Sequence, residues 1–213
     1  MKKISYAASF GTNALKEKTK ALIQPVLADF RGVSVRENTA VQMLQDIGVE
    51  AVRTCDPTLL LNAEDYRTLL CDDAKPQKVF SFILHKNQTW ANEIAKTVKQ
   101  HFNDDEDGEQ ILSVPEWLSA IDSCQMVVTN SFHATVFSIL FHKNFVVLPV
   151  AGKDMNDRIV TLLETVGLSK HFCADDAAVE ACLHDQIDWE SVDAQIDRIR
   201  QESAKWLINC IEI

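Results

Sequence analysis

The sequence predicts an α/β protein with a doubly wound, mainly parallel, Rossmann-like sheet. Short apolar runs, typical of buried strands, alternate with segments whose apolar residues recur at helical spacing. Turn-forming residues separate the segments. Strands that alternate with helices pair in parallel, because a parallel connection needs a crossover that is usually helical. We expect a single sheet, although Pro76–Gln77 is the best boundary if the chain forms two half-sheets.

The first half of the chain shows the alternation clearly. The predicted strands are 4–10, 32–35, 51–54 and 78–84, and the predicted helices are 15–30, 36–47, 63–70 and 87–102. Pro25 must kink or restart the first helix, because proline lacks a backbone N–H, and Gly48 is placed to end the second. The run 78–84 is almost entirely apolar, which favours a central parallel strand covered on both faces. Residues 103–108 predict an acidic turn.

The second half repeats the pattern. The predicted strands are 111–113, 126–128 and 145–150, and the predicted helices are 116–123, a helix from residue 131 or 132, 156–166 and 188–210. Pro115 suits the first position of its helix. We therefore predict one Rossmann-like domain over residues 1–187, with an amphipathic C-terminal helix, 188–213, that packs on it.

The most informative stretch runs from the strand 126–128 into the following helix. Asn130 and Ser131 are good N-cap residues, so His133 should lie in the first helical turn. A helix N-terminus carries a partial positive charge and binds anions, and ligands of open α/β sheets gather at such strand ends. A second strand-to-helix corner carries Arg36. In one parallel sheet both corners would lie at the same edge, where an arginine could bind a carboxylate or phosphate and a histidine could supply a proton.

Composition excludes several other classes of protein. A net charge of −10 in 213 residues gives no basic tract for nucleic acid. The six cysteines form no C-x-x-C pair, so we expect reduced thiols and no metal site. The dinucleotide, P-loop and nucleophile-elbow motifs are absent from the sequence. Neither a signal peptide nor an apolar run of membrane-spanning length occurs, so we expect a cytoplasmic protein, with the inner face of the membrane as an alternative location.

The same corners carry a resemblance to a known family. Four segments occur in a fixed order, residues 3–11 (KISYAASFG), 34–37 (SVRE), 56–61 (DPTLLL) and 129–137 (TNSFHATVF), and a later one covers 156–168. In this order and spacing the sequence resembles the polysaccharide pyruvyl transferase family over residues 3 to about 170. The resemblance implies a GT-B-like fold, of which this chain is similar to the C-terminal, donor-binding part. Family members usually carry a further α/β segment before the Ala-Ala-Ser-Phe-Gly strand.

The resemblance also implies a reaction and a set of site residues. A pyruvyl group would pass from phosphoenolpyruvate to hydroxyls of a sugar or glycolipid acceptor and form a ketal. His133 would be the catalytic acid, and the substrate-binding residues would be Arg36, Asn130, Ser131 and Arg158. The scheme requires no cofactor and no metal. Members often show Ser-Arg-x-His, whereas here Ser131 is followed directly by Phe132 and His133. The chain could act as a homo-oligomer or with a partner that supplies the other half.

Other interpretations remain open for these residues. A GT-B-like glycosyltransferase would bind a nucleotide-sugar at the same edge and use a carboxylate, for which Glu164 and Asp154 are the nearest candidates. A truncated, non-catalytic module could bind an anion or a partner. His133 could simply cap its own helix, Arg36 could form a surface pair with the next residue, Glu37, and Arg158 could lie on a solvated helix face. Residues 56–58 favour a structural turn in which the aspartate bonds the backbone.

Overall fold

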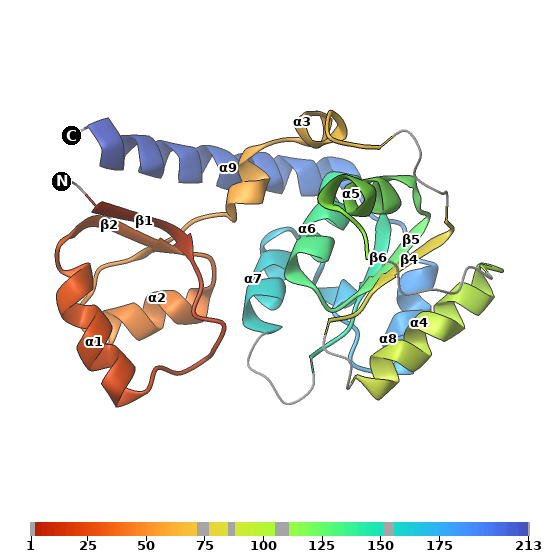
Figure 1. The fold of residues 1–213 in the computed structure, drawn as a ribbon, viewed down its shortest axis with the longest axis horizontal. Coiled ribbons are helices and arrows are strands. Elements are labelled where there is room, and N and C mark those ends of the chain that lie inside the picture. Colours follow the sequence, from red (N-terminus) through yellow and green to blue (C-terminus); the bar gives the residue numbers. More distant parts are fainter. Residues whose placement is uncertain (1–2, 72–76, 85–87, 105–110, 151–155, 213) are drawn as a thin grey trace. The chain divides into compact units, whose positions relative to one another are not determined.

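The computed structural model describes residues 3–71, 77–84, 88–104, 111–150 and 156–212. Internal contacts divide the chain into two compact units, which are described separately. The first unit comprises Met1–Leu60, Gly152–Gly167 and Glu190–Ile213, and the second comprises Leu61–Ala151 and Leu168–Trp189. Each unit contains its own three-stranded parallel sheet (Figure 1).

The first unit is built on the strand order β1-β2-β3. Its strands are β1 (Lys3–Ala8), β2 (Phe30–Val35) and β3 (Val52–Arg53). Its helices are α1 (Glu17–Leu27), α2 (Asn38–Gln45), the 3-10 helix η1 (Pro57–Leu60), α7 (Asp157–Thr165) and most of α9 (Trp189–Glu212). In Figure 1, α1 and α2 lie on one face of this sheet and α9 lies on the other.

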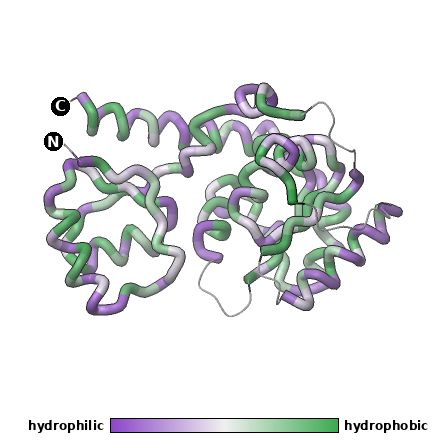
Figure 2. The backbone as a smooth tube through the Cα atoms, viewed as in Figure 1, coloured by the Kyte–Doolittle hydropathy of each residue, from purple (hydrophilic) through white to green (hydrophobic). Residues whose placement is uncertain are grey.

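Helices cover both faces of the first sheet, and particular residues of β2 explain how closely they pack. Val33 and Val35 of β2 pack with Leu44 of α2 in a buried apolar cluster. On the other face Gly32 lets α9 approach closely, because a Cβ atom there would lie 2.7 Å from the Sγ atom of Cys210. In Figure 2 hydrophobic and hydrophilic residues alternate along α9, as expected of a helix that packs by one side.

The second unit is built on the strand order β4-β5-β6. Its strands are β4 (Val79–Phe82), β5 (Met126–Thr129) and β6 (Asn144–Val147). Its helices are α3 (Ala63–Arg67), α4 (Thr89–His101), α5 (Val114–Ser123), α6 (Phe132–Leu140), α8 (Asp176–Leu183) and the 3-10 helix η3 (Ser169–His171). Residues of α4 and α8 share a buried cluster with alternate strand residues. On the opposite face, Trp117 of α5 packs edge-on against Phe82 of β4 and Phe137 of α6.

These observations confirm the predicted α/β class with parallel, Rossmann-like sheets, but the expectation of one sheet is wrong. The described strands form two sheets, so the two corners belong to different sheets. The run 78–84 was expected to be central, yet β4 is an edge strand and β5 is the central one. Both are rich in apolar residues, because helices cover both faces of the sheet out to its edge. Pro76, Asp154 and most of the predicted acidic turn lie outside the described residues.

Two other elements differ from the sequence prediction. Residues 111–113 form no strand, because the side chain of Ser113 caps α5 by accepting a hydrogen bond from the backbone N–H of Glu116. Helix α8 had not been predicted, although Asp175 provides an N-cap whose side chain accepts from the N–H of Ala178, 2.8 Å away. Within the described part of the chain, no helix combines the length and apolar character needed to cross a membrane.

Candidate active site

The first corner begins with an irregular end of β1. Ala7 has a positive φ of 50°, and the pairing of β1 with β2 shifts register between Ser5 and Ala8. The N–H of Ala7 donates to Oγ of Ser34 at 2.8 Å, and the hydroxyl of Thr54 donates to the same oxygen at 2.9 Å. A left-handed alanine is uncommon and costs free energy, so these bonds hold a strained backbone in place. The pairing of β1 with β2 is therefore irregular at the end of β1.

Glu37 accepts hydrogen bonds from the residues that follow β1. Its Oε1 atom accepts hydrogen bonds from the hydroxyl of Ser9 at 2.7 Å and from the N–H of Phe10 at 3.1 Å. The residue is only 3% exposed, although it lies in the short connection between β2 and α2 and stands at the N-cap of α2. The alternative of an exposed Arg36–Glu37 pair is therefore wrong. Glu37 is a buried anchor for the loop after β1.

Arg36 instead forms its ion pair with Asp56. The pair joins Nη1 of Arg36 to Oδ2 of Asp56, whose side chain is 2% exposed, whereas that of Arg36 is 17% exposed. The other carboxylate oxygen, Oδ1, accepts from the N–H of Thr58 at 2.9 Å and from its hydroxyl at 2.6 Å. Burial raises the pKa of Asp56, but the bonds from Thr58 and the charge of Arg36 outweigh it, so the net pKa is lowered. The predicted structural turn is thus present, and it also holds the arginine.

Arg158 reaches the same neighbourhood from α7. Two side-chain bonds fix this helix within the first unit, one between Thr39 and Asp157 and one from Nη1 of Arg53 to the hydroxyl of Thr165 at 2.6 Å. Burial and the nearby charge of Arg36 lower the pKa of Arg158, whereas Glu37 and Asp56 act in the opposite direction.

The first unit therefore gathers two arginines and two buried carboxylates, which we call the arginine cluster. It comprises Arg36, Glu37, Asp56 and Arg158. Arg36 lies directly after β2 and Asp56 follows β3, so the cluster lies at the carboxyl edge of the first sheet. Each carboxylate accepts hydrogen bonds from nearby backbone, so Asp56 holds both Arg36 and the turn after β3, and Glu37 holds the loop after β1. Such a partly exposed pair of guanidinium groups suits a ligand with two anionic groups.

The second corner, between β5 and α6, is closed by polar side chains. Asn130 accepts from the N–H of Leu84 at 2.7 Å and donates to the carbonyl of the same residue at 2.9 Å, which extends the pairing of β4 and β5. The hydroxyl of Thr129 donates to the carbonyl of Phe82 at 2.6 Å and accepts from the N–H of Ser131 at 3.0 Å. Ser131 caps α6 by accepting from the N–H of Ala134, which confirms the predicted helix start. The side chains of Asn130 and Ser131 are engaged inside the corner, and their contact with substrate stays a prediction.

His133 is the exposed residue of this corner. It lies in the first turn of α6, where its ring meets that of Phe132 edge-on at 5.3 Å between centroids. Phe132 itself is 4% exposed and belongs to the core. The arginine of the Ser-Arg-x-His pattern therefore has no counterpart here, because a single buried aromatic residue stands between Ser131 and His133. A solvent-exposed histidine at a positive helix end can exchange protons with a bound ligand or with water.

The sequence-predicted site residues thus fall into two sets. Arg36 and Arg158 share the first unit, and Asn130, Ser131 and His133 share the second. Sequence reasoning missed Glu37 and Asp56 as members of the first set. The available signal was their position, since each closely follows a strand of the parallel sheet that also carries Arg36.

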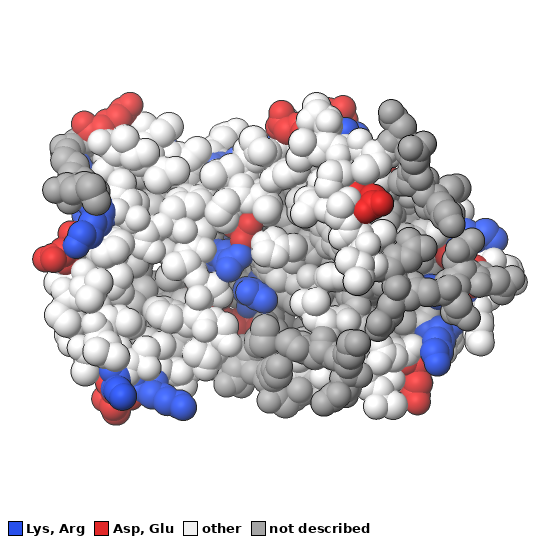
Figure 3. Space-filling model, viewed as in Figure 1, with Lys and Arg blue, Asp and Glu red and all other residues white. Residues whose placement is uncertain are grey.

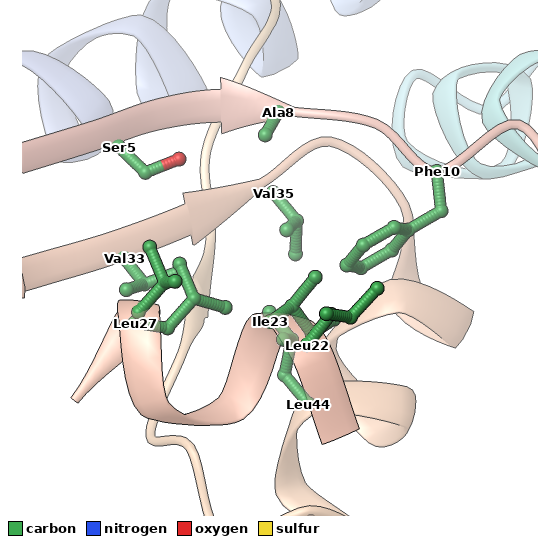
Figure 4. A pocket seen from close by; sticks show the side chains of 10 residues that line it. Ser5, Ala8, Phe10, Leu22, Ile23, Leu27, Val33, Val35 and Leu44 are labelled. Carbon is green, nitrogen blue, oxygen red and sulfur yellow. The ribbon is translucent and has the colours of Figure 1, made fainter. Parts of the chain in front are cut away.

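An apolar cavity of about 210 Å³ also lies in the first unit. Figure 4 shows its lining between the sheet and α1, including Ile23, Leu27, Val33 and Leu44. Helix α1 has no fully buried residue, but its Ile23 and Leu27 are partly buried and pack against the adjacent apolar cluster. The lining is almost free of polar groups, which makes the cavity unsuited to an anion.

Charged residues elsewhere are dispersed. Among the described residues on the face shown in Figure 3, lysines and arginines lie in small groups beside acidic residues rather than in one broad basic area. Within the same described part of the chain, no group of three or more His, Cys, Asp or Glu residues is arranged to hold a metal ion.

The fold and the two corners define a Rossmann-like α/β protein with an arginine cluster at one sheet edge and a helix-start histidine at another. Residues 1–151 match the family described as polysaccharide pyruvyl transferase. The match covers well over half of the chain, and the protein belongs to this family. Both strand-to-helix corners lie within the matched residues, and Arg158 lies beyond them. No curated protein matches the sequence significantly.

Proposed function

We propose that this protein transfers a pyruvyl group from phosphoenolpyruvate to hydroxyls of a sugar in polysaccharide biosynthesis and forms a ketal. The observation that carries the proposal is the arginine cluster, because phosphoenolpyruvate bears both a carboxylate and a phosphate. Arg36, held by Asp56, is proposed to bind one anionic group, and Arg158 the other. Family membership supports the pyruvyl transfer.

The proposed reaction adds a proton to the methylene carbon of phosphoenolpyruvate and a sugar hydroxyl to the adjacent, phosphate-bearing carbon. A proton added to the methylene carbon leaves a positive centre at the phosphate-bearing carbon. A sugar hydroxyl attacks this centre and loses its proton, phosphate then leaves, and a second hydroxyl of the same sugar closes the ketal and loses its proton. We propose His133 as the proton donor, on the basis of its exposed position at the start of α6.

Donor binding is tested by calorimetry with phosphoenolpyruvate on the intact chain. Arg158→Gln should weaken binding about tenfold or more, since a charge-assisted hydrogen bond contributes about 1.5–3 kcal/mol. Arg198→Gln is the matched control, because this arginine of α9 donates to the side chain of Gln195, one turn earlier on the same helix, at 2.8 Å. If Arg158→Gln and Arg198→Gln bind phosphoenolpyruvate with equal affinity, the arginine cluster does not bind the donor.

The role of His133 is tested separately by turnover. With a diol sugar as acceptor, His133→Ala should lower phosphate release about 100-fold and leave phosphoenolpyruvate affinity unchanged. His184→Ala is the control, since His184 is also exposed and lies in the same unit. Undiminished turnover in His133→Ala would exclude the acid role.

A non-catalytic, anion-binding module is the second candidate. It is favoured by the side chains of Asn130 and Ser131, which are engaged in the corner rather than turned to a ligand. This candidate predicts phosphoenolpyruvate binding that depends on Arg158, without phosphate release on any diol sugar. The two experiments above therefore separate the candidates.

A further inference from the structure

A cluster of reactive side chains lies in the second unit, outside the residues of both corners. His171 of η3 is 1% exposed, with Nδ1 2.9 Å from the carbonyl oxygen of Phe145 and Nε2 3.1 Å from Oδ2 of Asp185. Both partners are acceptors, so both ring nitrogens are donors when both bonds form, which only the imidazolium form allows. Asp185 also pairs with Lys170, Nζ to Oδ1, at 2.7 Å.

Two cysteines lie beside this histidine. Cys173 follows η3, Cys182 lies in the last turn of α8, and their Sγ atoms are 3.4 Å apart. Both are free thiols, exposed by 0% and 3% respectively. A disulfide has a sulfur–sulfur distance of about 2.0 Å, so the two sulfur atoms need to approach by little more than an ångström. The pair is therefore placed for a bond that requires only a small local movement.

The surroundings make the two thiols unequal. The hydrogen bond from Cys173 and the positive charge of His171 lower the pKa of Cys182 against the effect of burial. The pKa of Cys173 is raised, first by its bond to Cys182 and then by burial. Burial lowers the pKa of His171, but its interaction with the nearby Cys182, its hydrogen bond to the carbonyl of Phe145 and the charge of Asp185 raise it overall. Cys182 is thus the cysteine placed to attack as a thiolate, and Cys173 is the thiol placed to react with the oxidised Cys182.

We infer that Cys173 and Cys182 form a peroxide-sensitive dithiol that closes to a disulfide. The thiolate of Cys182 attacks one oxygen of hydrogen peroxide, the O–O bond breaks, hydroxide leaves, and a sulfenic acid forms. The sulfur of Cys173 then attacks the sulfur of Cys182, the S–O bond breaks, and the thiol proton leaves with the oxygen as water. The two cysteines lose two electrons, and peroxide is reduced to water. Asp185 and Lys170, which pair beside the cluster, have side chains that are 19% and 59% exposed, so the cluster lies close to the surface of the protein.

The experiment treats the reduced, intact chain with hydrogen peroxide, blocks the remaining thiols and analyses peptides by mass spectrometry. We expect a cross-linked peptide pair containing Cys173 and Cys182, which reverts on reduction with dithiothreitol. The oxidised protein should unfold several degrees higher, because the bond closes a loop between η3 and the end of α8. Cys71→Ser should leave the cross-link unchanged, since Cys71 is not part of the cluster.

A second measurement separates chemistry from folding. Cys173→Ser should stop at a sulfenic acid on Cys182, detected by a dimedone adduct, whereas Cys182→Ser should give no adduct at Cys173. His171→Gln should slow oxidation about tenfold in a protein with an unchanged circular dichroism spectrum, because it removes the cation that favours the thiolate. The inference is overturned if Cys173 and Cys182 both remain free after peroxide treatment and are fully alkylated.

Discussion

Asp56 shows how a single carboxylate can serve both the backbone and the site. One oxygen accepts two hydrogen bonds from Thr58 and fixes the turn after β3, while the other holds Arg36. A carboxylate as buried as that of Asp56 would be costly without these partners, because its charge would then lack compensation. The turn residue therefore determines where the guanidinium of Arg36 is presented.

Asp56→Asn should reduce the free energy of unfolding by about 3 kcal/mol at neutral pH, because the amide keeps an acceptor for Thr58 but loses the ion pair with Arg36. Since the folded-state pKa of Asp56 lies below its unfolded value, the stabilisation is complete above the unfolded pKa. It disappears as the pH falls through the folded pKa, so the difference between variant and wild type should shrink in acid.

Urea unfolding at neutral pH and at about pH 3 measures this difference. Asp197→Asn is the control, because Asp197 forms an exposed pair with Arg200 that should contribute about 0.5 kcal/mol or less. A constant difference between Asp56→Asn and wild type across the pH range would mean that the charge of Asp56 does not act as described.

At the scale of elements, local signals predicted the helix starts better than the strands. Ser131 caps α6 as expected, because a capping bond depends only on residues within one turn. The apolar pair Ile111–Leu112 suggested a strand, but Ser113 and Glu116 form a capping box that commits the chain to a helix start. A run of two apolar residues carries too little periodicity to decide between these outcomes.

Leu44→Ala tests the packing of α2 on the first sheet. Leu44 is 1% exposed and lines the apolar cavity beneath α1, so its truncation enlarges an existing space. The expected loss is about 3 kcal/mol in the free energy of unfolding, measured by urea denaturation. Gln45→Ala, on the exposed side of the same helix, should change it by no more than about 0.5 kcal/mol. Similar losses in the two variants would contradict this packing.

Gly32→Ala tests the docking of α9 on the other face. The added Cβ would lie 2.7 Å from Sγ of Cys210 and 3.0 Å from the ring of Trp206, so side chains of α9 must move. We expect a loss of about 2 kcal/mol in the free energy of unfolding, measured by urea denaturation. The double variant Gly32→Ala with Cys210→Ala should recover part of this loss, because it removes the closer contact. If the double variant is less stable than the wild type by the full sum of the two single losses, the contact does not limit the approach of α9.

At the scale of the whole molecule, the sequence predicted the α/β class but could not assign strands to sheets. Strand and helix periods are local, whereas the partner of each strand depends on which apolar faces meet across long stretches of chain. Nothing in the residues of β3 or β4 shows that they belong to different sheets. The same limit applies to the site. Arg36 was predicted from its position between a strand and a helix, but its ion pair with Asp56 could be identified only from the pairing of β2 with β3.

The first unit is assembled from three separate stretches of chain, and its last stretch is α9. The N–H of Cys55 donates to the hydroxyl of Ser203 at 2.9 Å, and Arg200 donates to the carbonyl of Leu59 at 2.7 Å, so α9 holds the segment after β3.

Removal of residues 190–213 should therefore loosen the first sheet, whose β1–β2 amides should exchange hydrogen about 100-fold faster. The β4–β6 amides should keep their protection, because their core lies within the second unit. Hydrogen-exchange mass spectrometry of the truncated and intact chains measures both, with Arg198→Gln as a control for a change in α9 that breaks neither bond. Equal loss of protection in both sheets would show that the two units unfold together.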